Sequence, residues 1–308
     1  MTGDAFPLQA LLPIFAYFAI GFLFRRLGLA TAEHADFLFR LVFLATLPAL
    51  IFVSVSQAAL GRETALLPFC GFVVNASCAS LAIAVGRLRG WTPAMTGAAA
   101  VSVGIMNMGF TFPFVLATLG PGALADAILF DAGNAVFVAF FIYPIAEYFG
   151  HGKAGFSLAS VKRVMLSPIF VAIILALVVN LAGIDPGPVS DAVLGPVGAA
   201  TTPLMLMAVG MSFGRLGERA HAAIATISIR MLGGGMIGLC LAWLIGLQGF
   251  TAAVVIVSAA SPVGASAAAI ASVAGLDRET AVAAVSMSAL IGLVTTSVLL
   301  YITGVAFG

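Results

Sequence analysis

Residues 12–29 read LPIFAYFAIGFLFRRLGL, and residues 167–184 read SPIFVAIILALVVNLAGI. A Pro-Ile-Phe triplet stands at the same place in both stretches, and Pro13 and Pro168 are 155 residues apart (168 − 13). The same separation relates Pro48 to Pro203. Self-similarity at a fixed separation indicates an internal duplication. We therefore predict two repeats, residues 1–149 and 165–308, joined by a polar cytoplasmic linker at residues 150–164.

The amino-acid composition is typical of a protein embedded in a lipid bilayer. Of the 308 residues, 62% are hydrophobic and 8% are charged, and the mean hydropathy is +1.18. A soluble domain has about 25% charged residues, so this chain has too few to cover a water-exposed surface. The 13 Lys and Arg residues nearly balance the 12 Asp and Glu residues, which gives no basic field for nucleic acid. We predict an all-α integral membrane protein.

Apolar stretches long enough to cross a bilayer recur along the chain. About 20 apolar residues are needed, because a helix rises about 1.5 Å per residue through about 30 Å of hydrocarbon. We predict ten spans: residues 8–28, 36–58, 64–86, 93–118, 122–148, 165–184, 189–213, 220–246, 250–274 and 279–305. Five spans per repeat is an odd number, so the second repeat enters from the opposite side. This is the inverted-repeat architecture of secondary transporters, whose substrate binds near mid-membrane.

Basic residues predict the orientation, because Lys and Arg gather in cytoplasmic loops. With the N-terminus outside, the cytoplasmic connections contain most of them: Arg25, Arg26, Arg87, Arg89, Lys153, Lys162, Arg163, Arg215, Arg219 and Arg278. The external loops contain Arg62 alone. We therefore expect both termini on the external side of the membrane.

Two predicted spans are interrupted at corresponding places. Residues 103–114 read VGIMNMGFTFPF and residues 258–269 read SAASPVGASAAA. Proline removes a backbone donor and glycine adds flexibility, so both favour a broken helix. The N-terminal ends of broken helices bind anions, although such prolines can also merely kink packed helices. We predict a site for a small organic anion formed by Asn107, Gly109, Thr111, Pro113, Ser261, Pro262, Gly264 and Ser266.

Ionisable side chains deep in a span are candidates for function. Asp131, with Asn134 beside it, can take a proton, bind Na⁺, pair with a basic group or be structural. Arg230 lies well inside a span; it binds the substrate carboxylate, balances Asp131 or snorkels to the cytoplasmic interface, and we favour snorkelling. Asn75 occupies the repeat-related position (230 − 155). We predict that these four residues provide ion coupling or polar support.

The chain also resembles a known family along nearly its whole length. The resemblance rests on a succession of short motifs: the stretch at residues 12–29, FRLVFLATLPALIF at 39–52, MNMGFTFP at 106–113, FDAGN at 130–134, IRM at 229–231 and SPVGASA at 261–267. In this order they are similar to the auxin efflux carrier family of bacterial permeases. That family is related to the plant PIN-type auxin exporters and includes organic-anion permeases.

The resemblance implies the fold of the bile acid/sodium symporters and sodium/proton antiporters, in which the fourth and ninth spans cross at broken segments. It places Asn107, Gly109 and Pro113 at one crossover, Pro262 at the other, and Asp131 with Asn134 as a polar pair. It also implies an elevator-type motion. Spans 1, 2, 6 and 7 would form a scaffold and the contact of a homodimer, in a bacterial inner membrane with periplasmic termini.

Two departures from the family pattern bear on the substrate. Ser266 stands where family members often carry Asn, and the fourth span lacks the Asn-Pro pair of the plant exporters, which argues against auxin. We expect secondary transport of a small mono- or dicarboxylate, with possible coupling to H⁺ or Na⁺. The alternatives are a Na⁺-coupled bile-acid-like symporter and a non-transporting sensor or scaffold. The sequence contains no hydrolase or zinc-protease motif, so we expect no enzyme, cofactor or metal.

Overall fold

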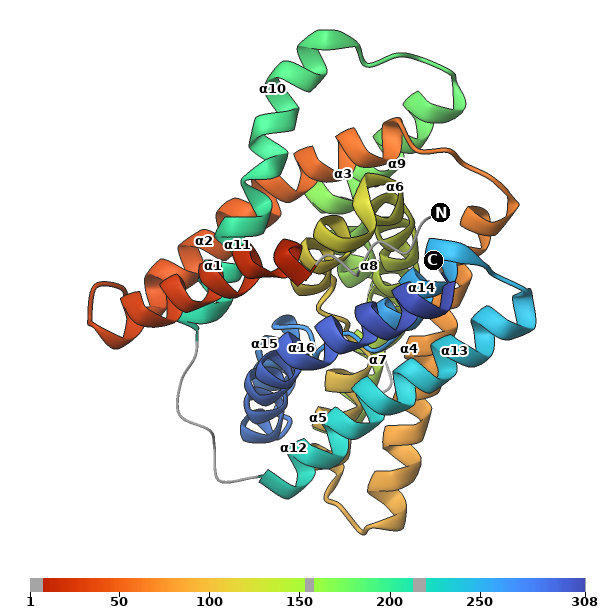
Figure 1. The fold of residues 1–308 in the computed structure, drawn as a ribbon. Coiled ribbons are helices and arrows are strands. Elements are labelled where there is room, and N and C mark those ends of the chain that lie inside the picture. The colour runs from red at the N-terminus through yellow and green to blue at the C-terminus, as the bar shows by residue number, and fades with distance from the viewer. Residues whose placement is uncertain (1–7, 153–157, 213–219, 308) are drawn as a thin grey trace.

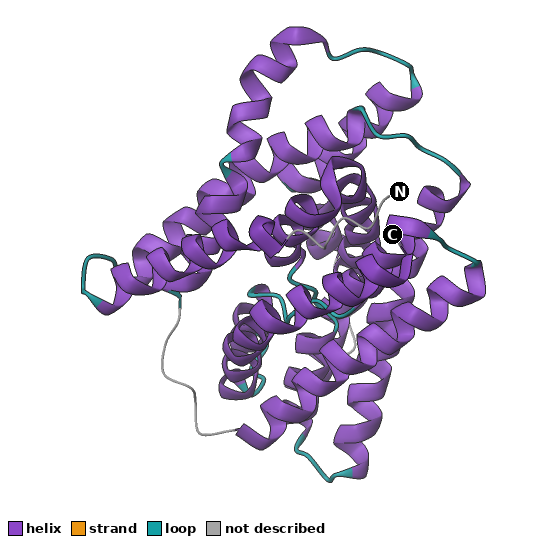
Figure 2. Ribbon diagram, viewed as in Figure 1, coloured by secondary structure: helices purple, strands orange, loops and turns teal. Residues whose placement is uncertain are grey.

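The computed structural model describes residues 8–152, 158–212 and 220–307, shown in Figure 1. The regular elements in these ranges are helices (Figure 2), with one isolated antiparallel bridge between Met106 and Val263. Lys153, Arg215 and Arg219, which contribute to the predicted orientation, lie outside the described residues.

The helices follow one another with short connections. Those of the first half are α1 (Leu8–Arg26), α2 (Ala32–Leu41), the π-helical segment η1 (Val42–Thr46), α3 (Leu47–Ser56), α4 (Arg62–Leu88), α5 (Pro93–Val103), α6 (Met108–Phe137), the π-helical segment η2 (Val138–Ile142) and α7 (Tyr143–His151). Those of the second half are α8 (Leu158–Met165), α9 (Pro168–Leu181), α10 (Gly187–Ala199), α11 (Thr201–Met211), α12 (Ala220–Ile227), the π-helical segment η3 (Ser228–Gly233), α13 (Gly234–Ile245), α14 (Gly249–Ala259), α15 (Ser266–Val273) and α16 (Arg278–Phe307).

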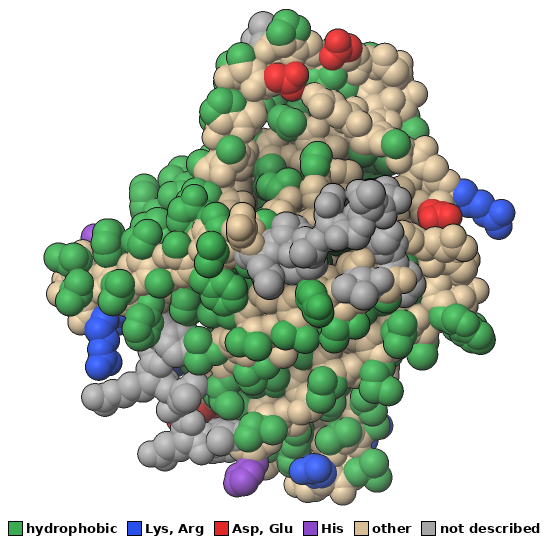
Figure 3. Space-filling model, in the orientation of Figure 1, with side chains coloured by type: hydrophobic (Ala, Val, Ile, Leu, Met, Phe, Trp, Pro, Cys, Tyr) green, Lys and Arg blue, Asp and Glu red, His purple; other side chains and the backbone are tan. Residues whose placement is uncertain are grey.

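The prediction of an all-helical membrane protein is confirmed. In the described part of the chain, six helical segments are long and apolar enough to cross a membrane: Ala32–Ser56, Arg62–Leu88, Met108–His151, Ser190–Met211, His221–Ile245 and Arg278–Gly304. Shorter apolar helices are Pro93–Val103, Pro168–Leu181 and Gly249–Ala259. In the space-filling view (Figure 3), hydrophobic side chains spread across the face and charged ones lie near its edges, as expected for a surface that contacts lipid.

Local sequence explains where several helices begin. Thr92 and Ser167 cap α5 and α9, and their side-chain oxygens accept hydrogen bonds from the backbone N–H groups of Met95 (3.2 Å) and Phe170 (3.3 Å). A proline follows each cap, where its missing N–H group costs nothing. The predicted linker is partly helical, because α8 begins within it and ends one residue after it. Long α6 contains a kink at Gly120, whose φ of 86° suits glycine.

Close contacts between backbones join the helices. In one group, α1 packs on α11 and α3 packs on α9. A Cβ atom on Gly21 would lie 2.1 Å from the carbonyl oxygen of Met207, and one on Gly210 would lie 2.3 Å from that of Phe18. In the other group, α4 packs on α6, α13 on α14, and α12 and α14 on α16. These two groups meet at the broken helices (Figure 1).

Candidate functional site

Two interrupted helices cross inside the protein. One interruption separates α5 from α6, and the other separates α14 from α15. The N–H group of Asn107 donates to the carbonyl oxygen of Pro262 (2.9 Å), and the N–H group of Gly264 donates to that of Ile105 (2.8 Å). The residues between the half-helices thus form a short antiparallel pair. This pairing satisfies backbone groups that would be costly if left free in a membrane.

Side chains from two further helices support the crossing. Ser288 of α16 accepts the N–H group of Val263 with its hydroxyl oxygen (3.0 Å), and Asn134 of α6 accepts that of Met106 with its amide oxygen (3.3 Å). The crossing also needs a glycine. A Cβ atom on Gly264 would lie 2.6 Å from Cγ2 of Ile105 and 3.0 Å from the carbonyl oxygen of Met106.

The structure corrects the expectation that Pro113 belongs to the break. Pro113 lies inside α6, where its missing N–H group removes one helical hydrogen bond without ending the helix. The break lies earlier: Gly104 directly follows the last residue of α5, and Asn107 caps α6 by accepting a hydrogen bond from the N–H group of Phe110 on its side-chain oxygen (3.2 Å). A capping asparagine replaces the hydrogen bonds that the interrupted helix loses.

A cavity of about 250 Å³ lies beside the crossing. Six of the residues that the sequence singled out line it: Asn107, Gly109, Asp131, Asn134, Gly264 and Ser266. The opposite wall is mostly apolar and includes Phe43, Met205 and Ile169. Helices α6 and α15 both begin at this cavity, because Met108 and Ser266 are their first residues. The partial positive charge of two helix N-terminal ends therefore falls on it.

Four of the eight residues predicted to bind the anion do not line this cavity. Thr111 and Ser261 are fully buried, and Thr111 donates its hydroxyl to the carbonyl oxygen of Asn107 (3.3 Å). Pro262 contributes its carbonyl oxygen to the crossing. Pro113 lies further along α6. We interpret Thr111 and Pro262 as stabilising the crossing through these hydrogen bonds.

Arg230 lies on the other side of the crossing and is fully buried. Its Nη1 atom donates to Oδ1 of Asn75 (2.8 Å) and to the carbonyl oxygen of Val103 (2.8 Å), and Nη2 donates to the carbonyl oxygen of Ala259. Val103 and Ala259 are the last residues of α5 and α14. One guanidinium group therefore binds the C-terminal ends of both interrupted helices. The prediction that Arg230 snorkels is wrong, because its acceptors lie inside the protein.

Two amides connect Arg230 to the cavity. Nδ2 of Asn75 donates to Oδ1 of Asn134 (2.8 Å), and Nδ2 of Asn134 donates to Oδ1 of Asp131 (2.7 Å). A chain of hydrogen bonds through the two amides thus connects Arg230 to Asp131, and no direct ion pair joins them. The sequence singled out all four residues. It gave no signal for the carbonyl acceptors, for Ser288 or for the apolar wall, which come from distant parts of the chain.

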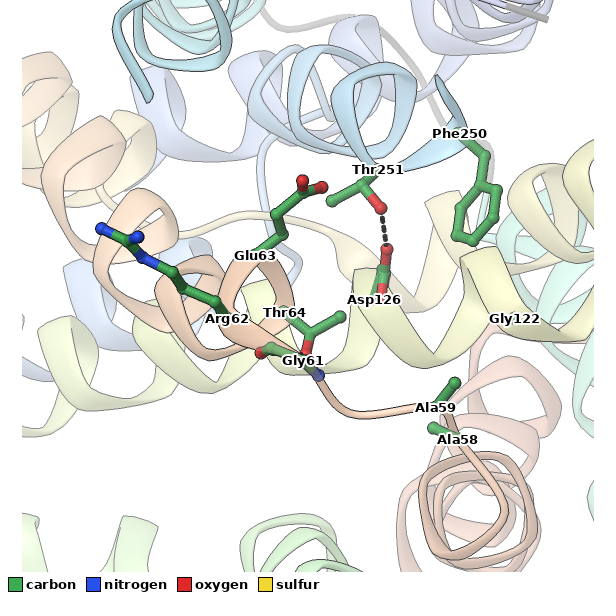
Figure 4. A pocket seen from close by; sticks show the side chains of 10 residues that line it. All are labelled: Ala58, Ala59, Gly61, Arg62, Glu63, Thr64, Gly122, Asp126, Phe250 and Thr251. Atoms are coloured by element: carbon green, nitrogen blue, oxygen red, sulfur yellow. Dashed lines mark hydrogen bonds between the residues drawn. The ribbon is translucent and has the colours of Figure 1, made fainter. Parts of the chain in front are cut away.

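A second cavity, of about 380 Å³, lies where α4 and α14 begin. Figure 4 shows the carboxylates of Asp126 and Glu63 on this cavity, with Thr251 beside Asp126. The Thr251 hydroxyl donates to Oδ2 of Asp126 (2.7 Å). Among the described residues, no cluster of three or more His, Cys, Asp or Glu side chains is placed to hold a metal ion.

The helices and their interrupted pair define a multi-pass integral membrane protein. Comparison with known proteins gives the class its name: residues 156–300 match the family described as Membrane transport protein. The chain is also 24% identical over 292 residues to an uncharacterized transporter of Methanothermobacter thermautotrophicus, covering 93% of this chain and 95% of that protein. Over residues 156–300 the chain therefore matches a family of membrane transport proteins, which confirms the predicted resemblance to the auxin efflux carrier family. This is a transporter family and not an enzyme family.

Proposed function

We propose that this transporter carries a small organic anion, such as a mono- or dicarboxylate, and that the anion binds in the cavity beside the crossing. The observation that supports this most directly is that the N-terminal and C-terminal ends of the interrupted helices lie at different places. The N-terminal ends of α6 and α15, which attract anions, face the cavity. The C-terminal ends of α5 and α14, which attract cations, bind Arg230. The cavity is thereby left with donors for an anion.

The proposed mechanism depends on an inverted repeat, and two contacts support one. Asn75 and Arg230 are 155 residues apart and share a hydrogen bond. Asn107 and Pro262, at the same separation (262 − 107), are joined through their backbones. When two copies are related by a twofold axis, equivalent residues touch only on that axis. Both contacts therefore favour an axis through the crossing.

Helix packing is consistent with the same axis. Exchange of the two proposed repeats replaces α1 by α9 and α11 by α3. The contact of α1 with α11 then becomes the contact of α9 with α3, and both contacts are present. We propose that α1–α3 with α9–α11 form a static scaffold and the contact of a homodimer. Helices α4–α7 and α12–α16 would move the site across a bacterial inner membrane by an elevator-type motion.

Asp131 adds a requirement for ion coupling. Its carboxylate lines the same cavity and receives one hydrogen bond, from Asn134. Two negative groups in one small cavity repel each other. A cation that enters with the substrate removes this repulsion. We therefore propose that Asp131 couples anion transport to H⁺ or Na⁺.

Counterflow in proteoliposomes tests the proposed site. Labelled malonate, succinate and indole-3-acetate serve in turn as probes. We expect wild-type protein to exchange at least one of them, Asn107→Ala to lower the rate at least tenfold, and Asp131→Asn to change it. Thr92→Ala is the matched control, since it also removes a helix cap worth about 1 kcal/mol but lies outside the cavity. Wild-type rates in folded Asn107→Ala and Asp131→Asn protein would refute the site.

A further inference from the structure

We propose that Arg230 is a resident cation that takes the place of a coupling Na⁺ ion, so that the transporter works without Na⁺. In other transporters with broken helices, unwound carbonyls and half-helix C-terminal ends bind the coupling ion. Here the guanidinium group of Arg230 binds both such ends. This inference rests on the proposed function in one respect, because it takes the crossing to be the transport site.

The ligands of the guanidinium group are those of a cation site. Its three acceptors are two backbone carbonyl oxygens, of Val103 and Ala259, and the amide oxygen of Asn75. None is a carboxylate. The acceptors come from α5, α14 and α4, and Arg230 comes from η3, so the charge joins four elements. A helix C-terminal end has a partial negative charge, and two such ends meet at this one group.

The position of Arg230 explains how such a charge is kept in a membrane protein. The side chain is fully buried, so it has no contact with water or lipid. A buried charge is stable only when it is hydrogen-bonded and electrostatically compensated. Three hydrogen bonds and two helix ends provide this for Nη1 and Nη2, while Nε is buried with no hydrogen-bond partner among the described residues. An arginine is charged at every physiological pH, so this cation is permanent, whereas a bound ion would come and go.

Arg230 is also a positioning residue for the cavity. Because Asn75 accepts from the guanidinium group with its oxygen, its NH₂ group faces Asn134. Asn134 accepts with its oxygen in turn and directs its own NH₂ group to Asp131. The permanent charge therefore fixes both amides, and with them the carboxylate that lines the cavity. Because the guanidinium group occupies the position of a coupling Na⁺ ion, the coupling at Asp131 is to H⁺.

Thermal unfolding of purified protein tests the resident cation without any substrate. Arg230→Ala removes the guanidinium group and leaves its three acceptors unpaired. We expect the Tm to fall by roughly 5 °C or more, and low millimolar guanidinium or Na⁺ to raise it again in a saturable way. Choline chloride holds the ionic strength constant. Arg163→Ala, which removes an exposed cation, is the control and should respond to neither ion.

Three results would overturn the proposal. If neither guanidinium nor Na⁺ raises the Tm of Arg230→Ala, the residue is merely structural. If Arg230→Ala does not fold, the wild-type protein decides: a saturable rise of its Tm in Na⁺ over K⁺ would show a separate Na⁺ site. Wild-type counterflow that requires Na⁺ would contradict the proposal as well. If the Asn107→Ala counterflow test refutes the anion site, the Tm measurements on Arg230→Ala still test the resident cation. Failure of the proposed function and failure of this inference are therefore distinguishable.

Discussion

Gly264 is the residue at which the crossing is most sensitive to a small change. Gly264→Ala places a Cβ atom 2.6 Å from Ile105 and 3.0 Å from a backbone oxygen. Overpacking of this kind costs about 1–3 kcal/mol, so we expect a clear fall in Tm. In Gly195→Ala the new Cβ atom meets nothing within 4 Å, and helix propensity favours alanine by about 1 kcal/mol. Equal Tm values for the two variants would contradict the packing at the crossing.

Some candidate residues stood out in the sequence because their chemistry is unusual for their surroundings. A carboxylate, an arginine and amides within apolar spans are rare, so Asp131, Asn134, Asn75 and Arg230 stood out. Their connection was not predictable, because it requires knowing which helices touch. The same reason explains the error over Arg230: its acceptors are backbone carbonyls, which every residue possesses and no sequence pattern marks.

At the scale of helices, α1 and α11 pack with their backbones in close contact. Gly21→Ala and Gly210→Ala each direct a Cβ atom at a backbone oxygen of the other helix, which cannot move aside as a side chain can. We expect each variant to lower the Tm. Gly122→Ala is the control, since its Cβ atom meets only the far end of Phe250 at 3.9 Å. Unfolding followed by circular dichroism measures all three, and unchanged Tm values for Gly21→Ala and Gly210→Ala would refute this helix packing.

Hydropathy predicted the helices better than their interruptions. Each of the ten apolar stretches contains helix, because length and apolar character alone determine whether a segment suits a bilayer. The interruption near Asn107 was predicted in the right span, but it lies between Val103 and Met108 and does not include Pro113. Proline is tolerated inside α6, while the break depends on pairing with residues 262–264, which lie far away in sequence.

For the whole molecule, the distribution of basic residues predicts which side faces the cytoplasm. We expect Ala59→Cys to react with a membrane-impermeant maleimide on intact cells, and Arg89→Cys to react only after permeabilisation. Both positions are exposed at opposite ends of α4. The background carries Cys70→Ala, Cys78→Ala and Cys240→Ser, so that no other thiol reacts. The reverse labelling pattern would contradict the proposed periplasmic termini.

The account depends most on the pairing of residues 105–107 with residues 262–264. Disulfide formation in membranes by Met106→Cys/Val263→Cys, in the same cysteine-free background, tests it most directly. Partners across an antiparallel bridge lie about 4.5–5.5 Å apart between Cα atoms, which a disulfide can join. We predict a linked peptide by mass spectrometry after mild oxidation, and none for Met106→Cys/Val273→Cys. Failure of the first pair to link, while both thiols react with maleimide after unfolding, would contradict the crossing.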